Sequence, residues 1–336
     1  MSCINETENG MKGKKIIVTG GAGFIGSALT EQLLKLGCKV VCVDNFSTSR
    51  RENIAGFLAN PDYTLVEGDI CDTDLMKEVC SGADYVLHEA ALGSVPRSIA
   101  HPEASYQANI TGTASVFHAA ALGGVKRIVF ASSSSVYGDN TELPKQEPRT
   151  GNPISPYALT KKVCEQTALL FSRLYHIETV GLRYFNVFGR RQDPAGAYAA
   201  VIPRFMDALL HREQPVIYGD GSISRDFTYV DDVVQANIKA LTAPGINGMV
   251  MNVASNRMIS LLDLFDTVRN VLAEQDPEIG KIQPVFAPPR AGDIQNSLAD
   301  ISRARQFLGY EVQFTFEEAI RRTACWYQEN SKIYSK

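Results

Sequence analysis

Short apolar runs alternate with amphipathic stretches up to residue 189 of the chain. The runs KKIIVTG (14–20) and KVVCVDN (39–45) are rich in β-branched residues and stop at turn-forming residues, which is typical of buried parallel strands. Between them, FIGSALTEQLLKLG (24–37) repeats its apolar residues at helical spacing. Further strands are expected at 63–69, 83–91, 126–135 and 178–189, and further helices at 74–80, 109–124 and 156–176. This order predicts a Rossmann-type doubly wound parallel sheet with helices on both faces.

The pattern becomes less regular after residue 189. AVIPRFMDALLHRE (200–213) and DFTYVDDVVQANIKAL (226–241) are expected to be helical, and GDGSISRDF (219–227) is expected to be a loop. We therefore predict a dinucleotide-type domain over 14–188 and a smaller C-terminal α/β domain over 189–336. Residues 226–254 are expected to return to the first sheet.

Charge and composition exclude several classes of protein. Lysine and arginine number 33 against 37 acidic residues, a net charge of −4, so neither a nucleic acid nor an anionic membrane surface is an expected partner. No apolar run reaches the roughly 18 residues that a membrane-spanning helix needs. The seven cysteines form no C-x-x-C pair, so no metal site is expected. The polar start has no signal-peptide pattern, and we expect a cytoplasmic protein.

A glycine-rich loop joins the first strand to the first helix. TGGAGFIG places Gly20, Gly23 and Gly26 at G-x-x-G-x-x-G spacing, which suits a tight turn and close approach of the backbone to a pyrophosphate at a helix N-terminus. Asp44 ends the second strand, where its carboxylate can bond an adenosine ribose and repel a 2′-phosphate. The pattern favours NAD over NADP.

Three nearby charged residues allow two interpretations each. Arg50 and Arg51 follow Asp44 and either hold a phosphate or are solvated surface charges. Asp69 ends the third strand, where it either meets the adenine edge or serves as a turn or N-cap residue.

An acid–base constellation lies further along the chain. Tyr157 and Lys161 form Y-x-x-x-K and therefore share one helix face. An ammonium group stabilises a phenolate, which lets the tyrosine act as a base near neutral pH. Ser133 lies in ASSSSVYG at the carboxyl end of a predicted parallel strand, where open α/β sheets bind their ligands. Its hydroxyl can hydrogen-bond a sugar hydroxyl and relay its proton.

Four motifs together resemble the extended short-chain dehydrogenase/reductase family, and within it the nucleotide-sugar epimerases. These motifs are TGGAGFIG, SSSSVYG, SPYALTK and LRYFNVFG. The stretches ALGSVPRS, GNPISPYALTK and FNVFGRRQDPAGAYAAVIPRF are similar to the bacterial UDP-N-acetylglucosamine 4-epimerases of polysaccharide biosynthesis. The resemblance runs from about residue 14 to the end of the chain. It implies an NAD-binding first domain and a nucleotide-sugar-binding second domain.

The resemblance implies a function and a set of site residues. It implies NAD-dependent C4 epimerisation of a UDP-hexose through a transient 4-keto sugar, with Ser133, Tyr157 and Lys161 as catalytic residues. The implied cofactor site comprises Gly20, Gly23, Phe24, Ile25, Gly26, Asp44, Asn45, Asp69, Ile70, Ala90, Asn109, Tyr157, Lys161, Tyr184 and Val187. The implied substrate site comprises Ser94, Ser133, Ser134, Asn186, Gln192, Val201, Val216, Tyr218, Arg225, Arg290, Asp293 and Ser297.

One of these positions bears on sugar size. Epimerases restricted to plain hexoses tend to carry a tyrosine where this chain has Ser297, so the small residue leaves volume for an N-acetyl group. Ser297 can also be an ordinary strand residue.

Related functions remain as alternatives. Dehydratases of this family place an Asp–Glu pair after the serine or threonine, and decarboxylases usually a glutamate, whereas this chain has Ser134 and Ser135. UDP-glucuronate and UDP-glucose 4-epimerases are closer rivals, and a non-catalytic NAD-binding protein is a more distant one. The family also implies a homodimer formed through the helices at 109–124 and 156–176, although both helices can be covered within one chain.

Overall fold

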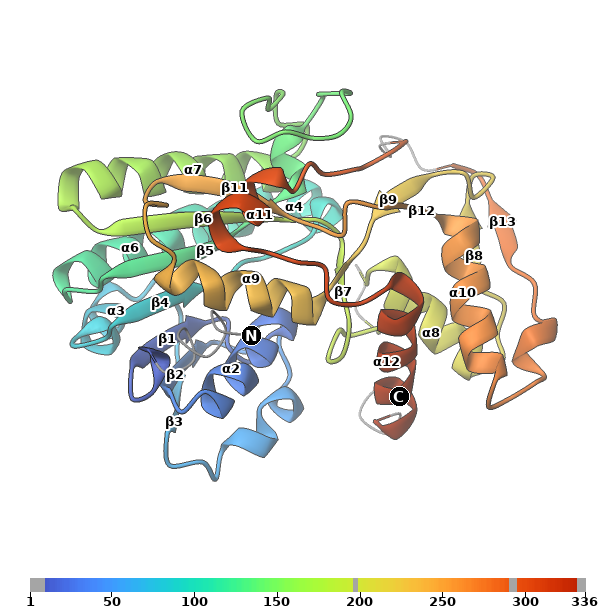
Figure 1. Cartoon of the computed structure of the whole chain (residues 1–336), viewed down its shortest axis with the longest axis horizontal. Coiled ribbons are helices and arrows are strands. Elements are labelled where there is room, and N and C mark those ends of the chain that lie inside the picture. Colours follow the sequence, from blue (N-terminus) through green and yellow to red (C-terminus); the bar gives the residue numbers. More distant parts are fainter. Residues whose placement is uncertain (1–9, 196–198, 290–294, 331–336) are drawn as a thin grey trace.

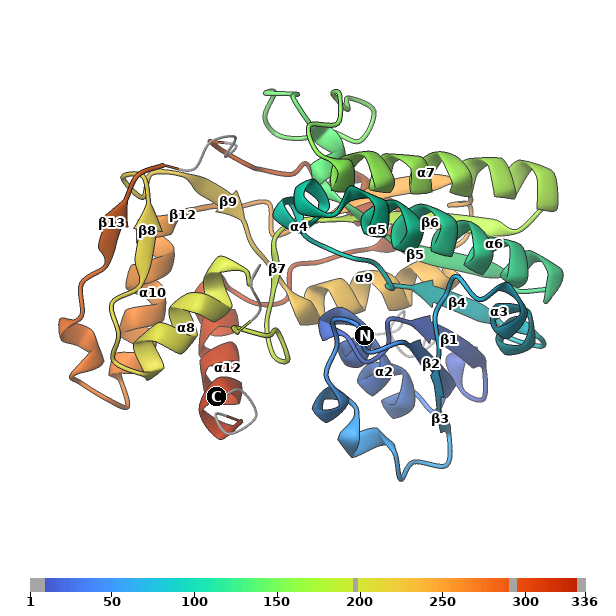
Figure 2. The same cartoon turned by 180° about the vertical axis from the view of Figure 1, so that it is seen from behind.

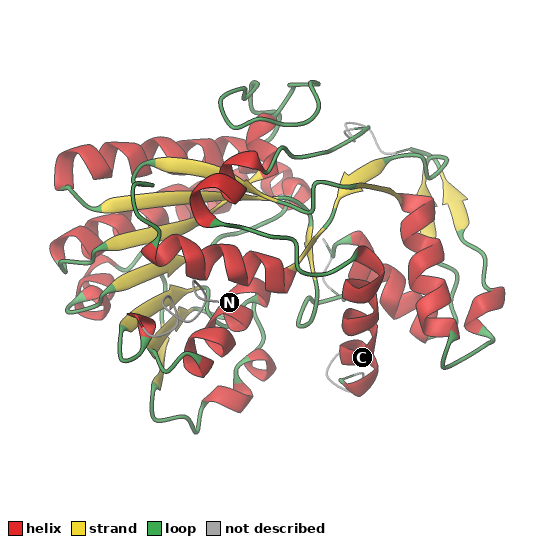
Figure 3. Cartoon of the chain, viewed as in Figure 1, coloured by secondary structure: helices red, strands yellow, loops and turns green. Residues whose placement is uncertain are grey.

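The computed structural model describes residues 10–195, 199–289 and 295–330, and it has two lobes (Figures 1 and 3). The larger lobe contains a seven-stranded, all-parallel sheet in the order β11-β6-β5-β4-β1-β2-β3. Its strands are β1 (Lys15–Thr19), β2 (Lys39–Asp44), β3 (Tyr63–Glu67), β4 (Tyr85–His88), β5 (Arg127–Ser133), β6 (Glu178–Tyr184) and β11 (Met249–Val253). The Rossmann-type fold that the sequence predicts is confirmed.

Helices cover both faces of this sheet because its central strands are apolar on both sides. Ile16 and Val18 point to one face and Ile17 to the other, and all three are fully buried. The helices α2 (Phe24–Lys35), α9 (Val230–Thr242) and α11 (Ser302–Leu308) lie on the first face, toward the viewer in Figure 1. The second face, seen in Figure 2, carries α3 (Thr73–Cys80), α6 (Gly112–Leu122) and α7 (Pro156–Tyr175).

The segment between β4 and α6 was not resolved into elements by the sequence pattern. It forms α4 (Val95–Ala100), α5 (Pro102–Tyr106) and a π-helical turn over Gln107–Thr111 that continues into α6. Short 3₁₀ turns occur at Arg51–Asn53, Ala55–Phe57, Ser134–Tyr137 and Ile279–Lys281.

The smaller lobe is a layer of helices with short strands at its upper edge in Figure 1. Its helices are α8 (Val201–Leu210), α10 (Leu261–Ala273) and α12 (Phe316–Glu329). Its strand pairs are β8 (Val216–Tyr218) with β13 (Val285–Ala287), and β9 (Ser224–Asp226) with β12 (Met258–Ser260). A third pair, β7 (Val187–Phe188) with β10 (Thr228–Tyr229), lies where the two lobes meet.

Two details differ from the sequence prediction. Residues 224–226 were expected in a loop but form β9, because an antiparallel partner, β12, is supplied from 258–260. The sequence FAPPRAGD (286–293), basic and rich in proline, predicts a loop, yet its first two residues belong to β13. No helix among the described residues is long and apolar enough to cross a membrane. The domain boundaries at 188 and 189 stay a prediction.

Candidate active site

A large cavity of about 1370 Å³ opens along the carboxyl ends of the parallel strands and extends toward the smaller lobe. This is the edge at which open α/β sheets bind ligands. Many of the residues singled out in the sequence line it. They are Gly20, Gly23, Phe24, Ile25, Gly26, Asp44, Asn45, Asp69, Ile70, Ala90, Ser133, Ser134, Tyr157, Lys161, Tyr184, Asn186, Val187, Gln192, Arg225 and Ser297. The structure thus brings the three motif groups into one space, while their individual roles stay predictions.

The glycine loop at one end of the cavity has no room for side chains. A Cβ on Gly26 would lie 2.1 Å from the carbonyl oxygen of Gly20, and Gly20 itself has a positive φ of 68°. Gly23 is the N-cap of α2, and no side chain caps that helix. Its first N–H groups and the positive end of its dipole are therefore available to a phosphate, as a dinucleotide requires.

Asp44 closes β2 beside this loop, at the place expected for a ribose-binding carboxylate. One carboxyl oxygen accepts hydrogen bonds from Phe46 N–H (2.9 Å) and Ser49 hydroxyl (2.7 Å), and the other accepts one from Ala22 N–H (3.0 Å). These bonds hold the carboxylate at the cavity wall. The arrangement fits NAD, because an anion at this point accepts ribose hydroxyls and repels a 2′-phosphate.

The other charged residues of this region are already paired. Asp69 accepts hydrogen bonds from Cys71 N–H (2.8 Å) and Asn45 amide (2.8 Å), so it serves as a turn residue as well as lining the cavity. The Cys71 N–H, counteracting burial, lowers the pKa of Asp69. Arg50 pairs with Asp193 and Arg51 with Glu67, so both arginines form ion pairs on the protein itself.

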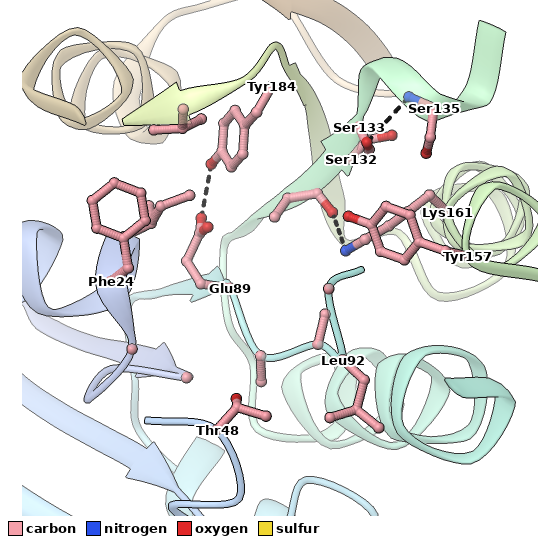
Figure 4. Close-up of a pocket in the computed structure, with 18 of the residues that line it drawn as sticks. Phe24, Thr48, Glu89, Leu92, Ser132, Ser133, Ser135, Tyr157, Lys161 and Tyr184 are labelled. Carbon is pink, nitrogen blue, oxygen red and sulfur yellow. Dashed lines mark hydrogen bonds between the residues drawn. The ribbon is translucent and has the colours of Figure 1, made fainter. Parts of the chain in front are cut away.

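Tyr157 and Lys161 enter the cavity from α7, whose start is fixed by two serines (Figure 4). Ser155 caps the helix by accepting a bond from Ala158 N–H (3.1 Å), and Ser98 accepts one from Tyr157 N–H (3.0 Å). The ammonium of Lys161 is almost fully buried, donates to the Ala131 carbonyl (2.8 Å) and lies 5.9 Å from the centre of the Tyr157 ring. The ammonium of Lys161 and the ring of Tyr157 therefore lie close together in the cavity wall.

The serine run faces this pair from the end of β5 (Figure 4). The Ser133 hydroxyl accepts a bond from Ser135 N–H (3.1 Å) and so caps the following 3₁₀ turn. The neighbouring Ser132 hydroxyl donates to Glu165 (2.5 Å). Glu165 also pairs with the buried Arg183 (2.8 Å), so this side of the strand is held by an ion pair. Within the run, Ser132 therefore anchors β5, and Ser133 lies beside Tyr157.

A second cavity of about 270 Å³ adjoins the first on the side of the smaller lobe. The two share Asn186, Val187 and Arg225 in their walls. Three further residues of the expected substrate site line the second cavity, namely Val201, Val216 and Tyr218. Arg225, expected in a loop, is held on β9 instead. A long ligand can therefore extend from the serine run past Arg225 to β8.

Some expected site residues lie elsewhere. Asn109 is buried behind the cavity, where its side chain bonds both the N–H (2.8 Å) and the carbonyl (3.2 Å) of Leu92. Ser94 caps α4 through a bond from Arg97 N–H (3.2 Å) and does not line either cavity. Both residues hold the segment after β4 in place. Arg290 and Asp293 lie outside the described residues.

Several lining residues were missed from the sequence. Glu89 follows β4 directly, so the rule that found Ser133 at a strand end could have found it too. Thr48 lies in the loop after Asp44, and Leu92 lies in the segment that Asn109 holds. Lys145 has no signal in the sequence, because it reaches the wall through a bridge to Ala299, far along the chain.

Comparisons with known proteins agree with this geometry. The model of the NAD dependent epimerase/dehydratase family matches residues 16–254. A putative UDP-glucose 4-epimerase of Methanocaldococcus jannaschii is 37% identical over 320 residues, which cover 94% of this chain and 99% of that protein.

Solved structures are similar over the same length. UDP-N-acetylglucosamine 4-epimerase from Methanobrevibacter ruminantium M1, in complex with UDP-N-acetylmuramic acid, is 40% identical with a TM-score of 0.85, covering 95% of this chain and 99% of that chain. UDP-glucuronic acid 4-epimerase from Bacillus cereus, in complex with UDP-glucuronic acid and NAD, is 30% identical with a TM-score of 0.84, covering 94% and 99%.

The family match and the cavity identify the cofactor independently. Three features suit an NAD molecule, and they lie together in one wall: the closely packed glycines of the loop, the uncapped start of α2 and the carboxylate of Asp44. NAD is the cofactor of this chain. By sequence and by fold, the chain belongs to the NAD-dependent epimerase/dehydratase family of the extended short-chain dehydrogenase/reductase type.

Proposed function

We propose that this protein epimerises UDP-N-acetylglucosamine to UDP-N-acetylgalactosamine at C4, through a transient 4-keto sugar, for polysaccharide biosynthesis. The observation that carries the proposal is a single cavity that contains the Tyr157–Lys161 pair at one end and a small residue, Ser297, near Arg225. The Tyr157–Lys161 pair supplies the acid–base chemistry of oxidation and reduction at C4. The small side chain of Ser297 leaves room for an acetamido group next to the Arg225 guanidinium, which can bind phosphate.

The side chains divide the proton chemistry between them. The Tyr157 phenolate takes the proton of the sugar 4-hydroxyl, and the buried ammonium of Lys161 stabilises that phenolate. Ser133 donates a hydrogen bond to the same sugar oxygen and aligns it with the tyrosine. Bound NAD would supply a reversible acceptor for the hydride at C4 of the sugar. Because the cofactor would end each turnover oxidised, no additional NAD would have to be supplied.

The absence of an acid next to Ser133 favours epimerisation over dehydration. Elimination of water needs a second acid and base beside the sugar. Positions 134 and 135 are serines, and Ser134 and Ser135 line the cavity. The side chains at these positions can bind a sugar but cannot exchange a proton with its carbon atoms near neutral pH.

The nucleotide end of the substrate is assigned to the second cavity. The Arg225 guanidinium, in the wall that both cavities share, can make paired hydrogen bonds to a diphosphate. Val216 and Tyr218 of β8 line the far part, where strand backbone can pair with a uracil edge. We assign Asn186 and Gln192 to the same substrate, beside the diphosphate and the sugar.

A second candidate substrate is UDP-glucuronate, and Lys145 is the observation that favours it. Lys145 lines the main cavity, and its ammonium donates to the Asn140 carbonyl. A cation in this wall suits a sugar carboxylate. The Bacillus cereus relative is named for that substrate, and the Methanocaldococcus jannaschii relative for UDP-glucose. The Methanobrevibacter ruminantium relative supports the N-acetyl sugar.

The protein is also proposed to be a homodimer. α7 exposes Leu169, Leu170 and Leu174, of which Leu174 is 63% exposed, and α6 exposes Leu122. In a single copy these leucines face water, which is unfavourable for large aliphatic side chains gathered on neighbouring helices. A second copy that packs the same face would bury them.

The direct test of the proposed reaction is proton NMR of purified protein with UDP-N-acetylglucosamine and no added NAD. New anomeric and H4 signals of UDP-N-acetylgalactosamine are expected, and Tyr157→Phe should lower the rate by about 100-fold or more, because general acid–base catalysis is lost. Tyr175→Phe, on the exposed end of the same helix, should leave the rate unchanged.

The remaining outcomes separate the candidates. Conversion of UDP-glucuronate or UDP-glucose but not of the N-acetyl sugar would keep the mechanism and change the substrate. No conversion of any of the three, even with NAD supplied, would contradict the epimerase proposal.

A further inference from the structure

Glu89 is an ionisable group in the main cavity that the proposed chemistry does not use. It follows β4, and its backbone N–H donates to the Thr19 carbonyl (3.1 Å) at the end of β1. The residue therefore lies between the glycine loop, which begins at Gly20, and the Tyr157–Lys161 pair. Figure 4 shows its side chain between Phe24 and Tyr184. This is the middle of the dinucleotide-binding wall.

Only one of its two carboxyl oxygens is engaged by the protein. The Tyr184 hydroxyl donates to Glu89 Oε1 (2.8 Å), and the Asn237 amide donates in turn to the Tyr184 oxygen (2.8 Å). Within residues 10–195, 199–289 and 295–330, no group donates a hydrogen bond to the other carboxyl oxygen. Asn237 of α9 thus holds Tyr184, which in turn holds Glu89, and the second carboxyl oxygen of Glu89 is left for the cavity.

The charged groups around Glu89 do not neutralise it. Lys161, from α7, acts on it electrostatically but donates its hydrogen bond to the Ala131 carbonyl. His88, the neighbour on β4, bonds Thr19 and Thr113, and burial and Lys161 lower its pKa to about 3, so it is uncharged.

Two further cations line the cavity, but Lys145 donates to the Asn140 carbonyl and Arg225 to the Ser224 carbonyl. Asp44 on β2 is an anion that is bonded to its own loop, and the side chain that Glu89 meets on β6 is the tyrosine. Among the described residues, Glu89 forms no ion pair. Burial raises the pKa of Glu89 to about 7, against the lowering effects of the Tyr184 hydroxyl and the Lys161 charge.

Glu89 lacks a positive partner, and NAD carries a positive charge on its nicotinamide ring only in the oxidised state. The oxidised nicotinamide ring bears a positive charge, and the reduced ring is neutral. An anion beside the ring stabilises the oxidised state, and loss of the ring charge leaves that anion without a counter-charge.

We propose that Glu89 is a proton-linked electrostatic partner of the cofactor, ionised when NAD is oxidised and protonated when NAD is reduced. In reduction the ring gains two electrons and one proton, and the Glu89 carboxylate gains a second proton from solvent. Atoms and charge balance, with the electrons supplied by the sugar in turnover or by a soluble donor in a test. The inference rests on NAD binding alone, and so it stands or falls separately from the proposed sugar.

The test is a redox titration of the NAD-loaded protein against soluble mediators, without sugar. Near-ultraviolet absorbance of the reduced ring gives the ratio of reduced to oxidised cofactor at a fixed potential, over roughly pH 5 to 9. Uptake of one proton changes this ratio about tenfold per pH unit, and uptake of two changes it about 100-fold. Wild-type protein should follow the steeper dependence below about pH 7 and the shallower one above it.

Glu89→Gln keeps the shape of the side chain and removes its titration. It should show the tenfold dependence throughout and a larger reduced fraction at neutral pH, because the anion that favours oxidised NAD is gone. Glu311→Gln, a change on the protein surface, should keep the wild-type profile. Identical profiles for wild-type protein and Glu89→Gln would overturn the proposal.

A second variant keeps the test decisive if Glu89→Gln does not retain NAD. Tyr184→Phe removes the hydrogen bond that stabilises ionised Glu89, so the change of slope should move to higher pH. An infrared difference spectrum should also gain a protonated-carboxyl band on reduction of the wild-type protein. A slope change that stays in place in Tyr184→Phe, or the absence of that band, would overturn the assignment to Glu89.

Discussion

Ser297 is a small residue in the wall of the main cavity. Its backbone N–H donates to the Ser224 carbonyl (3.2 Å), which holds the residue beside β9 and Arg225. A hydroxymethyl group at this position occupies little of the cavity that it lines. We propose that the side chain at 297 controls how large a group the neighbouring part of the sugar can carry.

Ser297→Tyr should separate the two sizes of sugar. Turnover of UDP-N-acetylglucosamine is expected to fall on the order of 100-fold, because the phenol takes the volume of the acetamido group, while UDP-glucose should keep its rate to within about threefold. Initial rates on both substrates measure this. Ser297→Ala should leave both rates unchanged, and equal losses on both in the tyrosine variant would refute the size control.

At the residue scale, the sequence predicts best what lies within one strand–turn–helix unit. Gly20, Gly26 and Tyr157 could be placed because their spacing alone puts them on one loop or one helix face. Glu89 was accessible to the same reasoning at the end of β4 and was missed. Lys145 could not be placed, because its position depends on a bridge to Ala299, and no local pattern encodes such a partner.

At the scale of elements, α7 has a buried side and an exposed apolar side. Its buried side carries Lys161 into the cavity, and its opposite side exposes Leu169, Leu170 and Leu174. A dimer that packs this face would also restrain the helix that carries the base. The association of two copies and the geometry of the site would then be coupled through one helix.

Leu170→Glu should weaken this association. Leu170 is 52% exposed in the single copy, so a charge there costs little in the monomer, but burial of the charge against a second copy is unfavourable. Sedimentation velocity should show a dimer for the wild-type protein and a dissociation constant raised about tenfold or more for the variant. Leu58→Glu, at a position 58% exposed outside α6 and α7, is the matched control and should remain dimeric. A monomeric wild-type protein would exclude the dimer.

The long elements of the larger lobe were predictable, and the short ones of the smaller lobe were not. Strands such as β1 carry their own apolar signal because both of their faces are buried. β9 has three residues, and it is a strand only because β12 pairs with it from 258–260. A segment this short contains too little pattern to be distinguished from a loop.

At the scale of the whole molecule, an ionic cluster ties α2 to the segment that leaves β7. Glu31 lies 2.9 Å from the Arg191 guanidinium and 3.5 Å from that of Arg190, and its other oxygen bonds Lys35 (2.7 Å). Burial alone would raise the pKa of Glu31, but the Lys35 hydrogen bond and the two guanidinium charges outweigh it and lower the pKa to about 2.

Glu31→Gln should destabilise the protein in a pH-dependent way. A carboxylate whose pKa falls from 4.5 to about 2 on folding stabilises the fold fully above pH 4.5, and that stabilisation is lost as the pH falls toward 2. The free energy of unfolding in urea should therefore drop by about 1 to 2 kcal/mol at pH 7, with a smaller difference below pH 4. Glu318→Gln, in an exposed pair with Arg322, should cost about 0.5 kcal/mol or less. A pH-independent difference for Glu31→Gln would contradict this.

The late position of β11 in the chain has a consequence for synthesis. Its neighbour β6 ends at residue 184, and β11 begins only at residue 249, after the first elements of the smaller lobe. While the ribosome makes the residues between them, β6 is an open sheet edge with unpaired backbone groups, and open edges recruit other strands. The nascent chain therefore needs protection from aggregation until residue 253 has emerged. In a fragment that ends at residue 188, the edge of β6 would stay unpaired permanently.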